Sequence, residues 1–215
     1  MFDWRNTGLS ERTGEDFSIE TAVRDLEAIV AVTGEGPVSI RMCVGAAFPV
    51  ITYAAKHPER IHRLATFNIM VGPWELSGYR QLDAIGALRD SDSGSNVLAR
   101  VTLGWTDHEK AEQLEEYFAS CSSPQYQADT MEIYQSLDVR HLVPLIEAPT
   151  LVVQRRQLAG PPTVAEAAEI AALFPNGRLL VVEGDNWDCR GWKTQSLRRS
   201  LSSTRGSPAA WPTPS

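Results

Sequence analysis

PVSIRMCVGAAFPVITYAAK, residues 37–56, combines a short apolar run, a turn of small residues and a helical repeat. The run at residues 37–42 has the length of a strand, and apolar residues recur with helical spacing from Ala46 to Lys56. A second helix is predicted just before it, over residues 18–32, with Ser18 as a candidate N-cap. A strand with helices on both sides is typical of a buried parallel sheet.

The rest of the chain repeats this alternation of strands and helices. We expect strands at residues 61–69, 148–154 and 178–184, and a helix at residues 163–174. This order predicts an α/β fold, with a mostly parallel sheet and flanking helices. The buried face of the helix at 18–32 is expected to hold Ile19, Val23, Leu26, Ile29 and Val30.

Two segments depart from that alternation. Residues 72–137 are polar, but apolar residues such as Leu114 and Tyr117 recur at helical spacing, which predicts a helical insertion over the sheet. From Arg190 onward the chain is rich in Ser, Arg and Pro without a usable period, which predicts a disordered tail. The expected divisions are the core at 1–71, the insertion at 72–137, the second part of the core at 138–189 and the tail at 190–215.

The composition is that of a globular chain with an acidic balance. Of its 215 residues, 43% are hydrophobic and 22% charged, which is enough apolar material for one sizeable core. The net charge of −7 argues against nucleic acid or an anionic membrane as a partner, and no apolar run reaches the ~18 residues that span a bilayer. The polar, acidic N-terminus argues against a secretory signal, so we expect a cytoplasmic location.

The cysteines and histidines predict neither a disulfide framework nor a metal site. The cysteines are far apart and odd in number, as is typical of reduced thiols. The histidines form no HxxxH or HExxH pattern, so we expect no zinc site and no cofactor. These residues are Cys43, Cys121 and Cys189, and His57, His62, His108 and His141.

Four segments together carry a resemblance to a known family. They are FDWRNTGLS (2–10), YAAKHPERIHRL (53–64), DVRHLVPLIEAPTLVV (138–153) and VVEGDNW (181–187). In these segments the chain resembles the α/β-hydrolases, and most closely the hydrolase-like domains found beside adenylate cyclases in bacteria. The resemblance implies an α/β-hydrolase-like sheet with residues 72–137 as a helical lid.

The same resemblance implies that the first strands of the family's usual domain are missing. That domain begins with several strands and with a loop that supplies one oxyanion-hole N–H. The resemblance begins after them, so we expect an N-terminally truncated domain with an exposed sheet edge.

The family's nucleophile lies in the motif G-x-S-x-G, and the resemblance places residues 42–47 there. Val44 then takes the position of the serine, although its side chain has no heteroatom. Since a β-branched residue tolerates positive φ poorly, we expect the turn to have relaxed. A register slip of one residue would instead make Cys43 a thiol nucleophile, and a small buried hydrophobe is the alternative role for this residue.

The family's acid and histidine positions also lack the expected groups. Leu158 or Ala159 stands near the acid position, and Arg155 and Arg156 predict an electropositive strand end, either solvated or facing an acidic ligand. Trp187 stands near the histidine position, and no histidine follows His141. The three groups of a serine-hydrolase triad are therefore expected to be absent.

These departures favour a hydrolase-fold protein that is catalytically inactive or impaired. Two alternatives stay open: an esterase-like hydrolase that uses Cys43, and a regulatory or interaction domain linked to cyclase signalling. We also expect a small-molecule ligand under the insertion and self-association through the exposed sheet edge. The expected residues of the relic site are Met42, Cys43, Val44, Gly45, Leu158 and Trp187.

Overall fold

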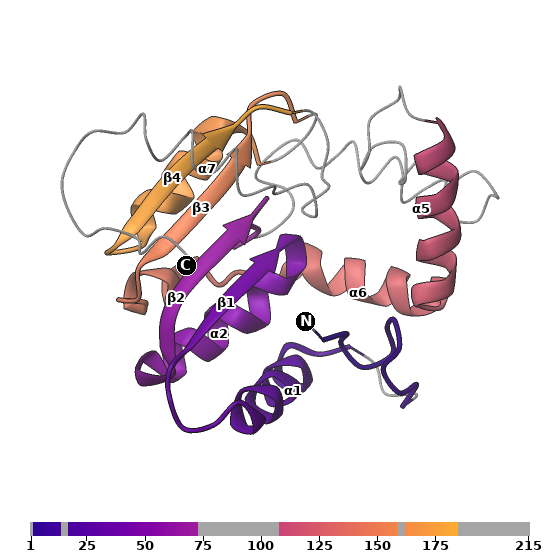
Figure 1. The fold of residues 1–215 in the computed structure, drawn as a ribbon, viewed down its shortest axis with the longest axis horizontal. Helices are drawn as coiled ribbons and strands as arrows, with labels where there is room; N and C mark the ends of the chain where they lie inside the picture. Colours follow the sequence, from indigo (N-terminus) through magenta and orange to yellow (C-terminus); the bar gives the residue numbers. More distant parts are fainter. Residues whose placement is uncertain (1, 14–16, 73–107, 159–161, 185–215) are drawn as a thin grey trace, which may run out of the picture.

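A computed structural model describes residues 2–13, 17–72, 108–158 and 162–184 (Figure 1). The described helices are α1 (Ile19–Val32), α2 (Ala47–Lys56), α5 (His108–Cys121), α6 (Pro124–Ser136) and α7 (Val164–Leu173). The described strands are β1 (Val38–Cys43), β2 (Ile61–Phe67), β3 (Thr150–Arg155) and β4 (Gly177–Val182). The described 3-10 helices are η1 (Val44–Ala46), η2 (Pro58–Arg60) and η4 (Arg140–Leu145).

The four described strands form one parallel sheet in the order β1-β2-β3-β4. Helix α2 connects β1 to β2, and α7 connects β3 to β4, because neighbouring parallel strands need a crossover connection. The register pairs Cys43 with Phe67 and Phe67 with Val153, so these three residues share one row across the sheet. The predicted mostly parallel sheet with flanking helices is confirmed.

Helix α1 begins where the sequence indicated. The Ser18 hydroxyl accepts a hydrogen bond from the backbone N–H of Thr21 at 3.1 Å, which satisfies one of the free donors of the first turn. Val23, Leu26 and Val30 are buried as expected. Ile29 was expected on the same face but is 37% exposed, because Ala22 and Thr21 complete the buried stripe instead.

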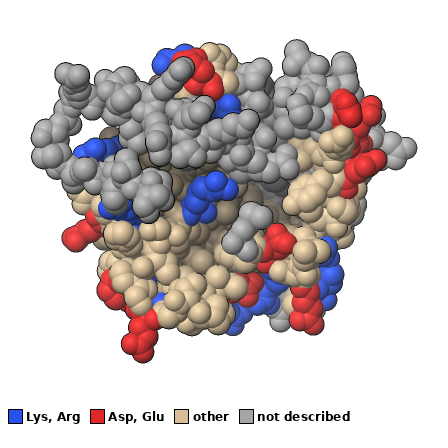
Figure 2. Space-filling model, viewed as in Figure 1, with Lys and Arg blue, Asp and Glu red and all other residues tan. Residues whose placement is uncertain are grey.

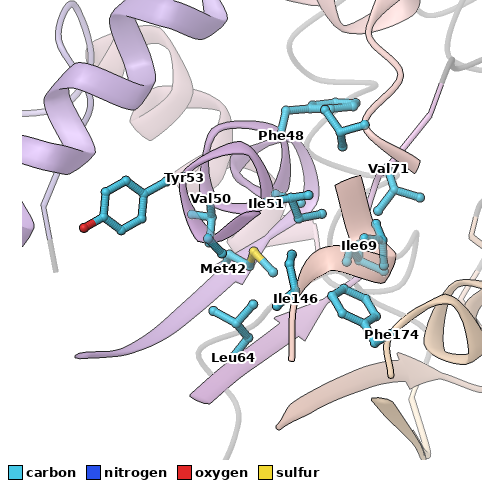
Figure 3. Close-up of a cluster of buried hydrophobic side chains, with 14 of the residues drawn as sticks. Met42, Phe48, Val50, Ile51, Tyr53, Leu64, Ile69, Val71, Ile146 and Phe174 are labelled. Carbon is cyan, nitrogen blue, oxygen red and sulfur yellow. The ribbon is translucent and has the colours of Figure 1, made fainter. Parts of the chain in front are cut away.

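The hydrophobic core lies between one face of the sheet and the helices α1, α2 and α7 (Figure 3). Met42, Leu64 and Val152 supply this face from three neighbouring strands. Phe48 and Ile51 of α2 pack against them and are fully buried. Since successive residues of a strand face opposite sides, the row of Cys43, Phe67 and Val153 belongs to the other face.

Helices α5 and α6 lie within the predicted insertion, whereas residues 73–107 lie outside the described part of the chain. Figure 1 shows α6 extending from the carboxyl end of β1 towards α5. Leu114 of α5 is buried, but Tyr117 is 55% exposed, so the expected apolar stripe of α5 is only partly covered. In the described part of the chain, no helix is both long and apolar enough to cross a bilayer.

Candidate functional site

The turn between β1 and α2 holds Val44 in the left-handed backbone region, with φ 49°. Cys43, the last residue of β1, is extended with φ −142° and ψ 147°, and α2 begins three residues after Val44. Left-handed backbone at a β-branched residue costs of order 1–3 kcal/mol. The expectation that this turn had relaxed is therefore wrong, because the tight strand-to-helix turn is kept with valine at its tip.

A contact from α6 explains why the turn cannot relax freely. A Cβ placed on Gly45 would lie 2.2 Å from Cε2 of Tyr134 and 2.5 Å from its Cζ. A side chain at residue 45 would therefore have to displace the Tyr134 ring or the turn itself. Gly45 is thus held by its contact with Tyr134 of α6, and Cys43 is held by its pairing with Phe67 of β2.

Aromatic side chains enclose the Tyr134 ring beside the turn. The Phe17 ring meets it edge-on, with centroids 5.4 Å apart, and the tilted Phe48 ring lies 5.3 Å away. Burial raises the pKa of the Tyr134 phenol well above its ordinary range, and the nearby Tyr126 and Cys43 add to the rise. The phenol is therefore a neutral hydrogen-bond donor at physiological pH.

The neighbours of Val44 divide between core and surface. Met42 is 3% exposed and packs in the core, whereas Cys43 is half-buried on the other face of the sheet. Gly45 is buried under Tyr134. Residues 42–45 thus lie at the carboxyl end of β1 and the start of the turn that follows it.

Two described histidines lie at the amino ends of the strands, far from this turn. The His62 Nδ1 is 3.4 Å from the Ser39 hydroxyl, and Ser39 precedes Cys43 by about 13 Å of extended chain. His57 lies between Glu27 and Glu59, with nitrogen–oxygen distances of 3.4 and 3.8 Å. Neither imidazole can accept a proton at residues 43 or 44.

The other two histidines, His108 and His141, lie in elements outside the sheet. His141 lies in η4, where its charge contributes to lowering the pKa of Asp138, although the hydrogen bond from Arg140 has the largest effect. The side chain of His108 lies outside the described part of the chain, as do Ala159 and Trp187.

The segment after β3, where the family keeps its acid, is bonded to the end of β4. The Arg156 Nε lies 3.0 Å from Glu183 Oε1, and the Gln157 Nε2 donates to Glu183 Oε2 at 2.5 Å. The Arg155 guanidinium lies 5.5 Å from the centroid of the Phe67 ring. The prediction of an electropositive strand end is wrong for Arg156, because Glu183 neutralises it, and Leu158 is half-buried beyond the pair.

Glu183 is held in its charged form by these partners. Hydrogen bonds from Arg156 and then from Gln157 lower the pKa of Glu183 below its ordinary value. The backbone completes the link, since the Gly184 N–H donates to Gln157 Oε1 at 2.6 Å. Gly184 has φ 135°, and a Cβ on it would meet the Arg155 guanidinium at 2.1 Å, so glycine is required there.

Sequence reasoning missed a group of buried polar residues beside the turn. Asn68 follows β2 with φ 49° and is 1% exposed, and Thr66 and Gln154 are equally buried on β2 and β3. The only signal in the sequence was polar residues within apolar strands, which the alternation pattern assigns to solvent by default.

On the described surface, Figure 2 shows acidic and basic side chains interspersed along the lower rim of the molecule.

The fold of the chain is similar to that of several solved structures. The chain aligns with a hydrolase from Oleispira antarctica at 21% identity and TM-score 0.70, covering 92% of this chain and 78% of the other. It aligns with a bromoperoxidase from Bacillus anthracis at 13% identity and TM-score 0.78, with the same coverage. It aligns with an esterase from Rhodococcus at 15% identity and TM-score 0.75, covering 94% and 78%.

The parallel sheet, its flanking helices and these similarities define an α/β-hydrolase fold. No protein-family profile matches the chain, and no curated protein matches it in sequence. At these identities the similarity establishes the fold alone, and the function has to be argued from the site.

Proposed function

We propose that this chain is a hydrolase-fold protein that does not catalyse acyl transfer and instead binds a small molecule at the turn between β1 and α2. The observation that carries this proposal is the hydrocarbon side chain of Val44 at the tip of the turn, with φ 49°. In this fold the tip presents the nucleophile, and acyl transfer needs a heteroatom there that a nearby base can deprotonate.

The positions of the described proton acceptors support the loss of catalysis. His57 and His62 lie at the amino ends of the strands, whereas the turn lies at their carboxyl ends. After β3, Arg156 and Gln157 bind Glu183, so this carboxylate is already engaged by its own neighbours. In the described part of the chain, no histidine donates a hydrogen bond to Glu183.

The binding role is supported by the surroundings of the turn. Tyr134 from α6 and Phe48 from α2 meet there, with Phe17 on the other side of the tyrosine ring. Binding sites for small molecules are mostly apolar, with a few polar groups that fix the orientation. The Tyr134 hydroxyl and the half-buried Cys43 thiol are such groups.

The test is hydrolysis of p-nitrophenyl acetate by the purified full chain. We expect the same rate from the wild type, the Cys43→Ala variant and heat-unfolded protein, because surface nucleophiles give only a background rate. Saturable turnover in the wild type that disappears in Cys43→Ala, with unchanged circular dichroism, would refute the proposal.

A second candidate is thiol-dependent ester hydrolysis by Cys43. It is favoured by the place of this half-buried thiol, directly before the turn and close to Tyr134. Cys121 is also half-buried and serves as an internal control. A catalytic thiolate would react with iodoacetamide at neutral pH far faster than Cys121, whereas equal rates would exclude this candidate.

A further inference from the structure

Three buried polar side chains, on β2, just after β2 and on β3, lack a complete set of hydrogen bonds. Thr66 is 0% exposed, and Asn68 and Gln154 are each 1% exposed. The Thr66 hydroxyl, both polar atoms of the Asn68 carboxamide and the Gln154 Oε1 have no hydrogen-bond partner. Gln154 uses only its Nε2, which donates to the carbonyl of Pro162 at 2.6 Å.

The strand register places this group beside the turn. Phe67 pairs with Val153, and the Asn68 N–H donates to the Val153 carbonyl at 3.3 Å, so Asn68 lies next to Gln154. Phe67 also pairs with Cys43, so Val44 and Asn68 each come one residue after this pair. Val44, Asn68 and Gln154 therefore all follow the row of Cys43, Phe67 and Val153 at the carboxyl end of the sheet, where parallel sheets bind ligands.

The three side chains are uncharged and include both hydrogen-bond donors and hydrogen-bond acceptors. The Asn68 carboxamide offers an NH2 group that donates and an oxygen that accepts, Gln154 adds an acceptor oxygen, and the Thr66 hydroxyl can act either way. The charged Arg155 follows Gln154 but lies over Phe67 on the opposite face of the sheet. A ligand head group that satisfies this set must itself carry a donor and an acceptor, and must be neutral to enter without a counter-charge.

The cost of leaving these atoms unpaired is the physical reason to assign them a partner. A buried polar atom without a hydrogen bond loses its water contacts and gains nothing in return. Asn68 also adopts φ 49°, a conformation that asparagine tolerates better than most residues. An apolar residue of similar shape at Thr66 would avoid the cost at that position, so the unpaired polar atoms are better explained by binding than by packing.

We propose that Asn68, with Thr66 and Gln154, binds the carboxamide or lactam group of a small uncharged ligand. The ligand N–H donates to Asn68 Oδ1 or Gln154 Oε1, and its carbonyl accepts from Asn68 Nδ2. This assignment rests on the proposed binding function, for which it names the ligand class.

The test uses the full chain and 2-pyrrolidinone, a small lactam, with acetate as the charged comparison. We expect 2-pyrrolidinone to shift the NMR signals of the Asn68 side-chain amide in a saturable way, and acetate to have no effect. The Thr66→Val variant keeps the shape of the residue and removes a hydroxyl that has no partner. It should unfold at the same temperature as the wild type or higher, and bind the lactam about fivefold more weakly.

The Asn68→Asp variant replaces the donor and should abolish the saturable shift, whereas Asn176→Asp, at an exposed asparagine, should leave it unchanged. If Asn68→Asp fails to fold, the Thr66→Val result decides. The assignment would be overturned if 2-pyrrolidinone caused no saturable shift in the wild type. It would also be overturned if the Asn68 side-chain amide contacted only bound water in the presence of the lactam. Ester turnover would refute the non-catalytic proposal without affecting the lactam shift, so the two failures are distinguishable.

Discussion

The ring of Tyr134 occupies the space that any side chain on Gly45 would need, with Cε2 2.2 Å from the position of a Cβ. Helix α6 and the turn after β1 are therefore fitted to each other at one point. Both residues contribute to the surroundings of Val44, and this fit is open to a direct test.

Replacement of Gly45 by alanine should force α6 and the turn apart. We expect Gly45→Ala to lower the free energy of unfolding by about 1–3 kcal/mol, as overpacked sites do, in urea denaturation followed by circular dichroism. Gly36→Ala is the matched control, since a Cβ on Gly36 meets nothing within 4 Å. A Gly45→Ala variant as stable as Gly36→Ala would contradict the close contact.

Replacement of Val44 by asparagine should relieve backbone strain. Asparagine tolerates the left-handed region better than a β-branched residue, so Val44→Asn should raise the free energy of unfolding by about 0.5–1 kcal/mol. The control is Val32→Asn at the 82% exposed end of α1, which has helical backbone and should show no gain. Equal effects at the two positions would argue that Val44 is not strained.

The ionisation of Glu183 should make the stability of the protein depend on pH. Its pKa is lowered in the folded protein by Arg156 and Gln157, so its stabilising contribution is present at neutral pH and is lost as the pH falls through the folded-state pKa. The Arg156→Met variant should raise this pKa towards the ordinary value, as followed by NMR titration of the carboxyl carbon.

Arg178 lies at the other end of β4, so Arg178→Met is the control for removal of a positive charge. An unchanged Glu183 pKa in Arg156→Met, or the same rise in Arg178→Met, would show that the local hydrogen bonds do not set it.

Local patterns in the sequence were sufficient for the elements but not for their contacts. The parallel strands and the Ser18 cap were predictable because periodicity and capping depend on neighbouring residues. The left-handed backbone of Val44 was not, since valine alone argues against it and the contact that holds the turn comes from Tyr134 in α6. The pairing of Arg156 with Glu183 likewise joins two strand ends that only the sheet brings together.

Around the candidate site, too, features set by neighbouring residues were predictable and those set by contacts between distant segments were not. Residues 42–45 are consecutive in the sequence, and the expected strand and helix on either side were enough to place them at a strand end. The burial of Asn68 and Gln154 depends on which strands are neighbours and which face is covered, so their polar character alone predicted exposure.

The hydrogen bonds between Gln157 and Gly184 tie the segments that follow β3 and β4 into one unit. The Gln157 N–H donates to the Gly184 carbonyl at 3.1 Å, and the Gly184 N–H returns a bond to the Gln157 side chain. Thermal opening at this rim would have to break both bonds at once, so the two amides should exchange their hydrogens with deuterium at a common rate.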